Sequence, residues 1–136
     1  LFGAITLGSK EGGRIIIDGS NVISSGSSSY GIFAGGYSPN VTNVTVQNFN
    51  SYSSIFYVKN GDRSNVTCTI EDVIIKDCPK STGIYGYVYA GYDATINLTN
   101  VTITKCYKGI DLDSSRDTSQ IDLKVDSNTS INNNET

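Results

Sequence analysis

The sequence predicts an all-β protein that folds as a single parallel β-helix, a solenoid in which each coil contributes three strands. A short phrase recurs every 28 or 29 residues, and apolar residues alternate with polar ones inside the copies. A fixed period of roughly 20 to 50 residues indicates a repeat architecture, and an alternation of period two indicates strands. The 136 residues then form one domain, 1–136, of about five coils.

The copies of the phrase define the first strand of each coil. They read RIIIDGS at 14–20, NVTVQNF at 43–49, DVIIKDC at 72–78, NVTITKC at 100–106 and NTSINNN at 128–134. Further alternating runs come before the phrase, at 66–72 and 94–100, and after it, from 31, 54, 83 and 109. Each period therefore holds three strands.

Other folds explain the repeat less well. Gly, Asn and β-branched residues interrupt any pattern of 3.6 residues, which argues against helices. A β-sandwich is the alternative all-β fold, but it does not require the same residue type at the same corner in every period.

Composition limits the partners. Ten Lys and Arg face thirteen Asp and Glu, so the chain has no basic excess to neutralise phosphates and we expect no nucleic-acid partner. The sequence contains no run of about 18 apolar residues, so we expect no membrane insertion. The abundance of Gly, Ser, Thr and Asn is typical of a secreted β-rich protein, which predicts an extracellular or cell-surface location.

A polar residue recurs at the corner before the phrase, as Asn43, Asp72, Asn100 and Asn128. Short polar side chains tolerate tight turns and bond to nearby backbone groups. The same Asn-rich pattern creates seven N-x-[ST] sequons, at Asn40, Asn43, Asn65, Asn97, Asn100, Asn128 and Asn134. Two interpretations are open: some of these Asn carry glycans, with Asn40 and Asn65 the better candidates, or corner chemistry alone produces the motif.

A second column, at the end of the phrase, holds Phe49, Cys78, Cys106 and Asn134. Stacked strands lie about 4.8 Å apart, so a disulfide between Cys78 and Cys106 is geometrically possible. The favoured alternative is that all three cysteines, Cys68 included, are buried small apolar side chains. No His accompanies them and no C-x-x-C spacing occurs, so we expect no metal site and no cofactor.

The third column is aromatic. Phe33, Phe56, Tyr85 and Asp111 each follow an apolar residue that should point inward, so their own side chains are expected to point outward. Tyr87 and Tyr89 would extend this exposed stripe. Such a stripe on a flat sheet serves as a sugar-binding platform or as a protein interface. With the opposite parity, the aromatic residues would simply belong to the core.

Through the phrase NVTITKC…GIDL and its copies, the chain resembles the pectin-lyase-like right-handed parallel β-helix superfamily over nearly its whole length. Its Asn- and Thr-rich character is similar to that of adhesin-like cell-surface proteins of archaea and bacteria. The resemblance implies a right-handed coil and an extracellular structural or adhesive role. It transfers no binding residue, because those proteins lack a fixed site motif.

Hydrolases of that superfamily use close carboxylates with a His and an Arg/Lys pair, and its lyases use Ca²⁺-binding acids and a basic residue. This chain has no His. Its only acidic cluster, Asp111, Asp113, Arg116 and Asp117, is interpreted as a solvated loop edge. We therefore expect no enzymatic activity and no catalytic residue.

The two ends of the chain carry the functional prediction. The segments LFGAITL at 1–7 and SINNNET at 130–136 both look like parts of coils, and neither forms an amphipathic cap. Exposed solenoid ends invite stacking. We expect an extracellular structural protein that associates with itself, head to tail and through the aromatic flank, into a filament, sheath or surface layer. The alternatives are an adhesin or carbohydrate-binding module that recognises surface glycans and, further off, a polysaccharide lyase or hydrolase or a tailspike segment.

Overall fold

The computed structural model describes residues 13–21, 33–35, 40–59, 65–89, 91–115 and 118–135, and every regular element among them is a β-strand. The strands are β1 (Ile15–Asp18), β2 (Phe33–Gly35), β3 (Asn40–Thr42), β4 (Val44–Gln47), β5 (Ser54–Lys59), β6 (Val66–Glu71), β7 (Ile74–Val88), β8 (Ala94–Thr99), β9 (Thr102–Ser114), β10 (Ile121–Val125) and β11 (Ser130–Asn132).

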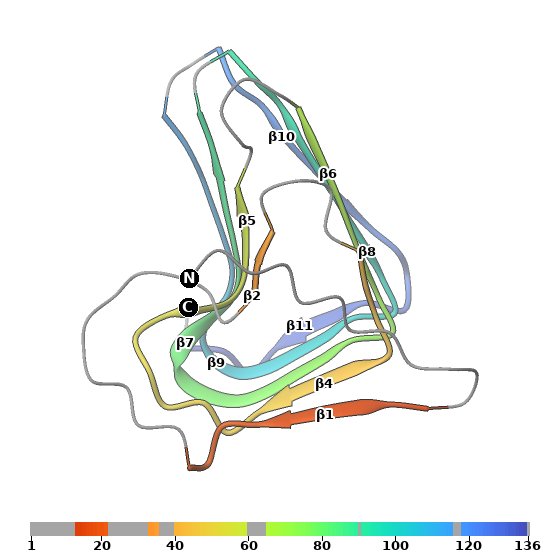
Figure 1. Cartoon of the computed structure of the whole chain (residues 1–136), viewed down its shortest axis with the longest axis vertical. Helices are drawn as coiled ribbons and strands as arrows, with labels where there is room; N and C mark the ends of the chain where they lie inside the picture. Colours follow the sequence, from red (N-terminus) through yellow and green to blue (C-terminus); the bar gives the residue numbers. More distant parts are fainter. Residues whose placement is uncertain are drawn as a thin grey trace.

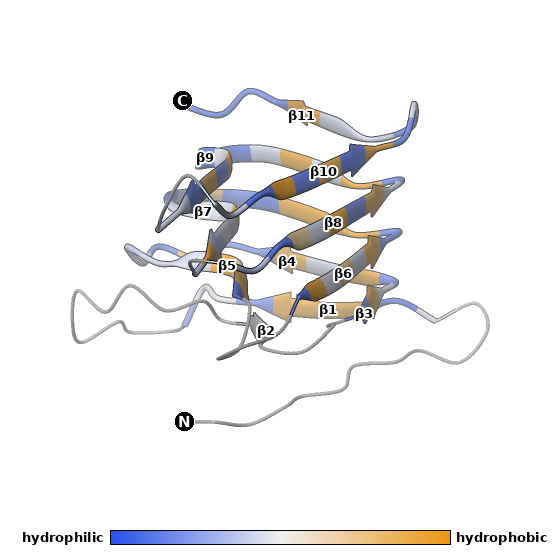
Figure 2. Cartoon of the chain, turned by 90° about the horizontal axis from the view of Figure 1, so that it is seen from above, coloured by the Kyte–Doolittle hydropathy of each residue, from blue (hydrophilic) through white to orange (hydrophobic). Residues whose placement is uncertain are grey.

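All strand pairs are parallel, and they form the three faces of a solenoid (Figure 1). The first face stacks β1, β4, the first part of β7, the first part of β9, and β11. The second face stacks β2, β5 and the second parts of β7 and β9. The third face stacks β3, β6, β8 and β10. Figure 2 shows the coils one above another. The predicted parallel β-solenoid is confirmed.

The solenoid has about three coils rather than the five that the sequence suggested. Coils that begin at β4, β7 and β9 have all three strands in the described residues. The last copy of the phrase adds only β11, and the first copy leads into the short strands β2 and β3. The count was too high because the first and last copies of the phrase were each counted as a full coil, whereas β2 and β3 have three residues each and the last copy supplies one strand.

The core lies inside the triangle and is built from the alternating residues of the three faces. Its largest fully buried side chains are Ile55, Ile70, Ile75, Ile84, Ile96, Leu98, Ile103, Val44, Val46, Val73, Val88 and Val101. Neighbouring coils stack similar side chains on one another, as in the column Val46, Ile75 and Ile103. Each such side chain contributes roughly 1.5 to 3 kcal/mol through its removal from water.

The predicted polar corner is confirmed for its first three members. Asn43, Asp72 and Asn100 have φ angles of 56°, 52° and 50°, a left-handed conformation that Asn and Asp adopt more readily than most residues. The amide Nδ2 of Asn100 donates to Oδ1 of Asp72 across neighbouring coils, at 2.6 Å. The sequence thus places the right side chains where the chain turns into its first face.

A second left-handed corner follows five residues later, and the sequence analysis missed it. Its members are Asn48, Asp77, Lys105 and Asn133, with φ between 51° and 61°. Lys105 is an unusual residue for this conformation. Its Nζ lies 3.1 Å from Oδ1 of Asp77 in the coil below, an exposed pair that adds little stability.

One buried hydroxyl provides a test of the packing. Ser54 Oγ is buried and has no hydrogen-bond partner among the described residues, and such a group costs about 1 to 3 kcal/mol. We expect Ser54→Ala to raise the free energy of unfolding by about 1 kcal/mol in urea titrations followed by circular dichroism. The matched control is Ser81→Ala, because buried Ser81 Oγ donates to the Ser51 carbonyl at 2.8 Å. That control should lower stability, and equal losses from both variants would contradict the interpretation.

Candidate functional surfaces

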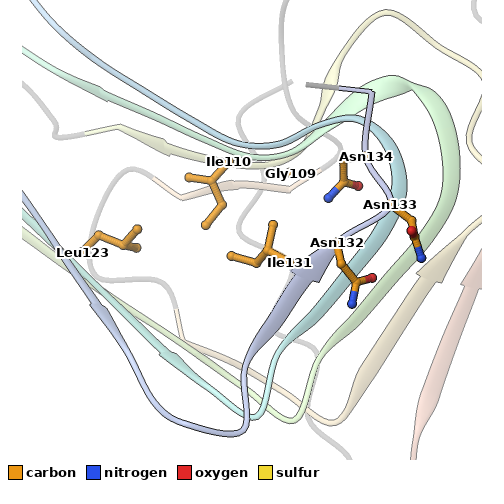
Figure 3. A pocket seen from close by; sticks show the side chains of 7 residues that line it. All are labelled: Gly109, Ile110, Leu123, Ile131, Asn132, Asn133 and Asn134. Atoms are coloured by element: carbon orange, nitrogen blue, oxygen red, sulfur yellow. The ribbon is translucent and has the colours of Figure 1, made fainter.

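The last coil ends in an open hollow. Its volume is about 490 Å³, and Gly109, Ile110, Leu123, Ile131, Asn132, Asn133 and Asn134 line it. Figure 3 shows the side chains of Ile110, Leu123 and Ile131 directed into the interior of the coil from its three faces. The hollow is therefore the cross-section of the apolar core.

Positions whose side chains are buried in earlier coils carry exposed side chains in the last coil. Leu123 continues the inward column above Ile96, and Ile131 continues the column above Ile103. Ile96 and Ile103 are fully buried, whereas Leu123 is 37% exposed and Ile131 41% exposed. Their exposure comes from their place in the stack, since no described residue lies on top of them.

The strands of this last coil also lie at the end of their sheets. A parallel strand at the end of a sheet presents backbone N–H and C=O groups that a further strand can pair with. Strands β10 and β11 each pair with one neighbour only among the described residues. The end of the solenoid therefore combines an apolar surface with rows of hydrogen-bonding groups.

The aromatic column is not the one expected from the sequence. Phe56 is only 3% exposed and packs in the core, so the expectation that it points outward is wrong. In the observed register Phe56 pairs with Ile84 on one side and with Phe33 on the other. The side chain of Phe33 lies outside the part of the structure that is described.

The error comes from the corner between the first and second faces. Six residues, 48–53, separate the paired positions Gln47 and Ser54 in the coil of β4. The corresponding corners hold five residues in β7 and three in β9. A change of one residue reverses which side chains face the core, so a constant period carried across this corner gives the wrong parity.

The outer side of the second face nevertheless carries aromatic residues, and we call it the tyrosine face. It consists of Tyr57 and Lys59 from β5, Tyr85 and Tyr87 from β7, Asp111 and Asp113 from β9, and Tyr89 next to β7. Tyr57, which the sequence analysis did not single out, stacks on Tyr85 with ring centres 5.4 Å apart and planes 17° apart. Tyr87 and Tyr89 make an edge-to-face pair at 5.1 Å.

Charged side chains lie on two sides of these rings. The Lys59 ammonium lies 4.9 Å from the ring centre of Tyr89, a cation–π contact. On the other side, Lys108 Nζ donates to Asp111 Oδ2 at 2.8 Å. Partial burial, the negative charge of Asp113 and, to a smaller extent, that of Asp111 raise the pKa of Tyr85. The two carboxylates are therefore close enough to influence the ionisation of the Tyr85 hydroxyl.

The cysteine column has the register expected from the sequence. Cys78 and Cys106 are paired positions on neighbouring coils, both buried, and both are free thiols, as is the buried Cys68. A hydrogen bond from the Cys106 thiol holds the pKa of Cys78 below its ordinary value, and the same contact together with burial raises the pKa of Cys106. Burial raises the pKa of Cys68 to about 12. These sulfurs act as core side chains in the structure.

Several sequon side chains have structural contacts. Asn134 Oδ1 accepts from the Cys106 backbone N–H at 3.0 Å, and its Nδ2 donates to the Ile103 carbonyl at 3.3 Å. Asn65 Oδ1 accepts from the Asp93 N–H at 3.0 Å. Exposed Asn40, Asn65 and Asn128 and half-buried Asn43 and Asn97 lie on or beside the third face. Glycan attachment at any of the seven stays a prediction.

The structure describes only part of the acidic cluster. Asp111 is paired with Lys108, and Asp113 Oδ1 accepts from the Ser114 N–H at 2.8 Å. Arg116 and Asp117 lie outside the described residues. Within the described ranges, no three His, Cys, Asp or Glu side chains gather where they could hold a metal ion, and no helix is long and apolar enough to cross a membrane.

Comparison of the chain with protein-family models, with curated proteins and with solved structures finds no match.

Proposed function

We propose that this chain is an extracellular structural protein that assembles end to end, so that the open last coil of one copy stacks on the first coil of the next. Filaments, sheaths or surface layers are the products of such stacking. The single observation that carries the proposal is the exposed core cross-section formed by Ile110, Leu123 and Ile131.

The first face of the chain offers a complementary strand. One inward column runs through Ile17, Val46, Ile75, Ile103 and Ile131. Strand β1 lies at the opposite end of the described stack from β11 (Figure 2). If a second copy is placed on the open end in the same register, its Ile17 continues the column directly above Ile131. Like residues would then meet across the junction as they do inside the solenoid.

The character of the surface supports an extracellular setting for this role. The outer side of the third face carries Thr67, Thr69, Thr95, Asn97 and Thr99, together with the charged residues Glu71, Asp122 and Lys124. A surface this rich in Thr and Asn suits a coat or a fibre. The resemblance of the sequence to Asn- and Thr-rich adhesin-like cell-surface proteins supports the same proposal. Membership of the pectin-lyase-like superfamily, as distinct from the solenoid fold itself, is likewise part of the proposal. We propose no catalytic role.

The test is sedimentation velocity and electron microscopy of the purified chain over a wide concentration range. We expect end-to-end oligomers that lengthen with concentration. Ile131→Lys should weaken the association by at least about a hundred-fold, because an unpaired charge would be buried at the junction at a cost of several kcal/mol.

The control is Asn97→Lys, which adds the same charge on the outer side of β8, away from both ends. It should leave the oligomers intact. Circular dichroism should show that both variants are folded. Monomers of the unmodified chain at every concentration would refute the proposal, as would equal effects of the two substitutions.

A further inference from the structure

The tyrosine face forms a regular grid, because its strands are parallel and in register. Tyr57 of β5 pairs with Tyr85 of β7, which pairs with Asp111 of β9. One step along the strands, Lys59 pairs with Tyr87, which pairs with Asp113. Over these three strands the grid has three rows and two columns, and on its far side β5 pairs with β2, where Ala34 lies beside Tyr57.

The charges in this grid are ordered. The β5 row contains the cation Lys59, the β7 row contains only tyrosines, and the β9 row contains the two carboxylates Asp111 and Asp113. Rows lie about 4.8 Å apart, so Lys59 and Asp113 are about 10 Å apart within one chain. Opposite charges therefore lie on either side of the β7 row.

This order is self-complementary under one two-fold rotation. Let the axis run along β7, between two copies that face each other. The rotation reverses the order of the rows and keeps each position along the strands. Lys59 then faces the partner's Asp113, and Tyr57 faces the partner's Asp111. The tyrosines of the β7 row, Tyr85 and Tyr87, face their own equivalents.

We propose that the tyrosine face is an isologous interface that pairs two copies of this chain side by side, with their stacking directions opposed. The contact adds lateral association to the proposed end-to-end stacking and does not depend on it. Aromatic residues are enriched at the centres of interfaces, and their rings lose little conformational entropy on binding.

Charge also disfavours the other two-fold arrangement. An axis along the stacking direction would keep the rows and exchange the columns. Asp113 would then face the partner's Asp111, and two carboxylates would repel each other across the interface. Only the axis along the strands brings each carboxylate to a donor.

Two of the contacts inside one chain leave room for this pairing. An ammonium has three donors, so Lys59 can remain over the Tyr89 ring and still bond the partner's Asp113. A carboxylate offers about four acceptor positions. Asp111 can therefore keep its Lys108 bond through Oδ2 and still accept a hydrogen bond from the partner.

The test uses Ile131→Lys as the parent, because that change removes end-to-end stacking and isolates lateral contacts. Sedimentation equilibrium of this parent should show a monomer–dimer equilibrium that weakens with added salt, since the pairs lie at the edge of the contact. Lys59→Glu and Asp113→Lys should each weaken the dimer at least about ten-fold, because each places like charges opposite one another.

The double variant Lys59→Glu with Asp113→Lys decides the matter. It exchanges the two charges, so the partner's residues again face opposite charges and the dimer should recover. Lys124→Glu changes a charge of the same kind on β10, in the third face, and should have no effect.

The inference fails if the parent stays monomeric at millimolar concentration, or if the double variant is as weak as the two single variants. Binding of a glucosamine oligomer by a monomeric parent, lost in Tyr87→Ala, would instead make this face a sugar-binding surface. None of these results bears on end-to-end stacking, which the unmodified chain and Ile131→Lys report separately.

Discussion

Ile103→Ala is expected to destabilise the solenoid by about 2 to 5 kcal/mol. Ile103 is fully buried in the column between Ile75 and Ile131. Removing its larger groups loses their transfer free energy and leaves a cavity that the stacked coils cannot close. A loss of this size is a large share of the stability of a small domain.

Urea unfolding followed by circular dichroism measures the effect. The matched control is Thr102→Ala, one residue earlier on the same strand, where the side chain is half-buried and on the outer side. That control should change stability by less than about 1 kcal/mol. A loss below about 1 kcal/mol for Ile103→Ala would mean that this column is not packed as the structure shows.

Gly83→Ala is expected to be the second most damaging change, at about 1 to 3 kcal/mol. A Cβ at this position would lie 2.6 Å from the Gly109 carbonyl oxygen and 2.7 Å from Cγ2 of Ile103. The first of these atoms is backbone in a stacked strand, so one coil must move away from the next. Overpacking of a filled core carries a cost of this order.

Gly109→Ala is the control, because it makes the same change one coil later. Its Cβ would meet side-chain atoms of Ile131 and Asn134 at the open end, where they can shift. We expect a smaller loss of stability, measured as the difference in thermal midpoint between the two variants. Equal losses would show that the end of the solenoid is as rigid as its middle.

The repeat was readable because stacking imposes a rule on the sequence. Each residue of a coil touches its equivalents above and below, so the columns that contain Val46, Ile75 and Ile103 must keep their character at a fixed spacing. The left-handed corner at Asn43, Asp72 and Asn100 was predictable for a related reason, since few residue types adopt that conformation easily. The cysteine register followed from the same period.

The sequence predictions that were wrong or incomplete share a different cause. The second corner includes Lys105, whose conformation is set by the coils around it rather than by its own preference. Phe56 was assigned to the surface because the corner lengths of six, five and three residues leave no trace in the period of the phrase. Tyr57 was missed with it, since the two adjacent residues exchange faces.

The sequence by itself therefore determined the all-β class, the parallel stacking and the first face of every coil, because a periodic pattern of apolar and polar residues specifies both the strand and its neighbours. Only the tertiary structure decided which residues face outward on the second face and how much of the core is exposed at the last coil. Both depend on how the chain crosses its corners and on where the stack stops, and local sequence preferences encode neither.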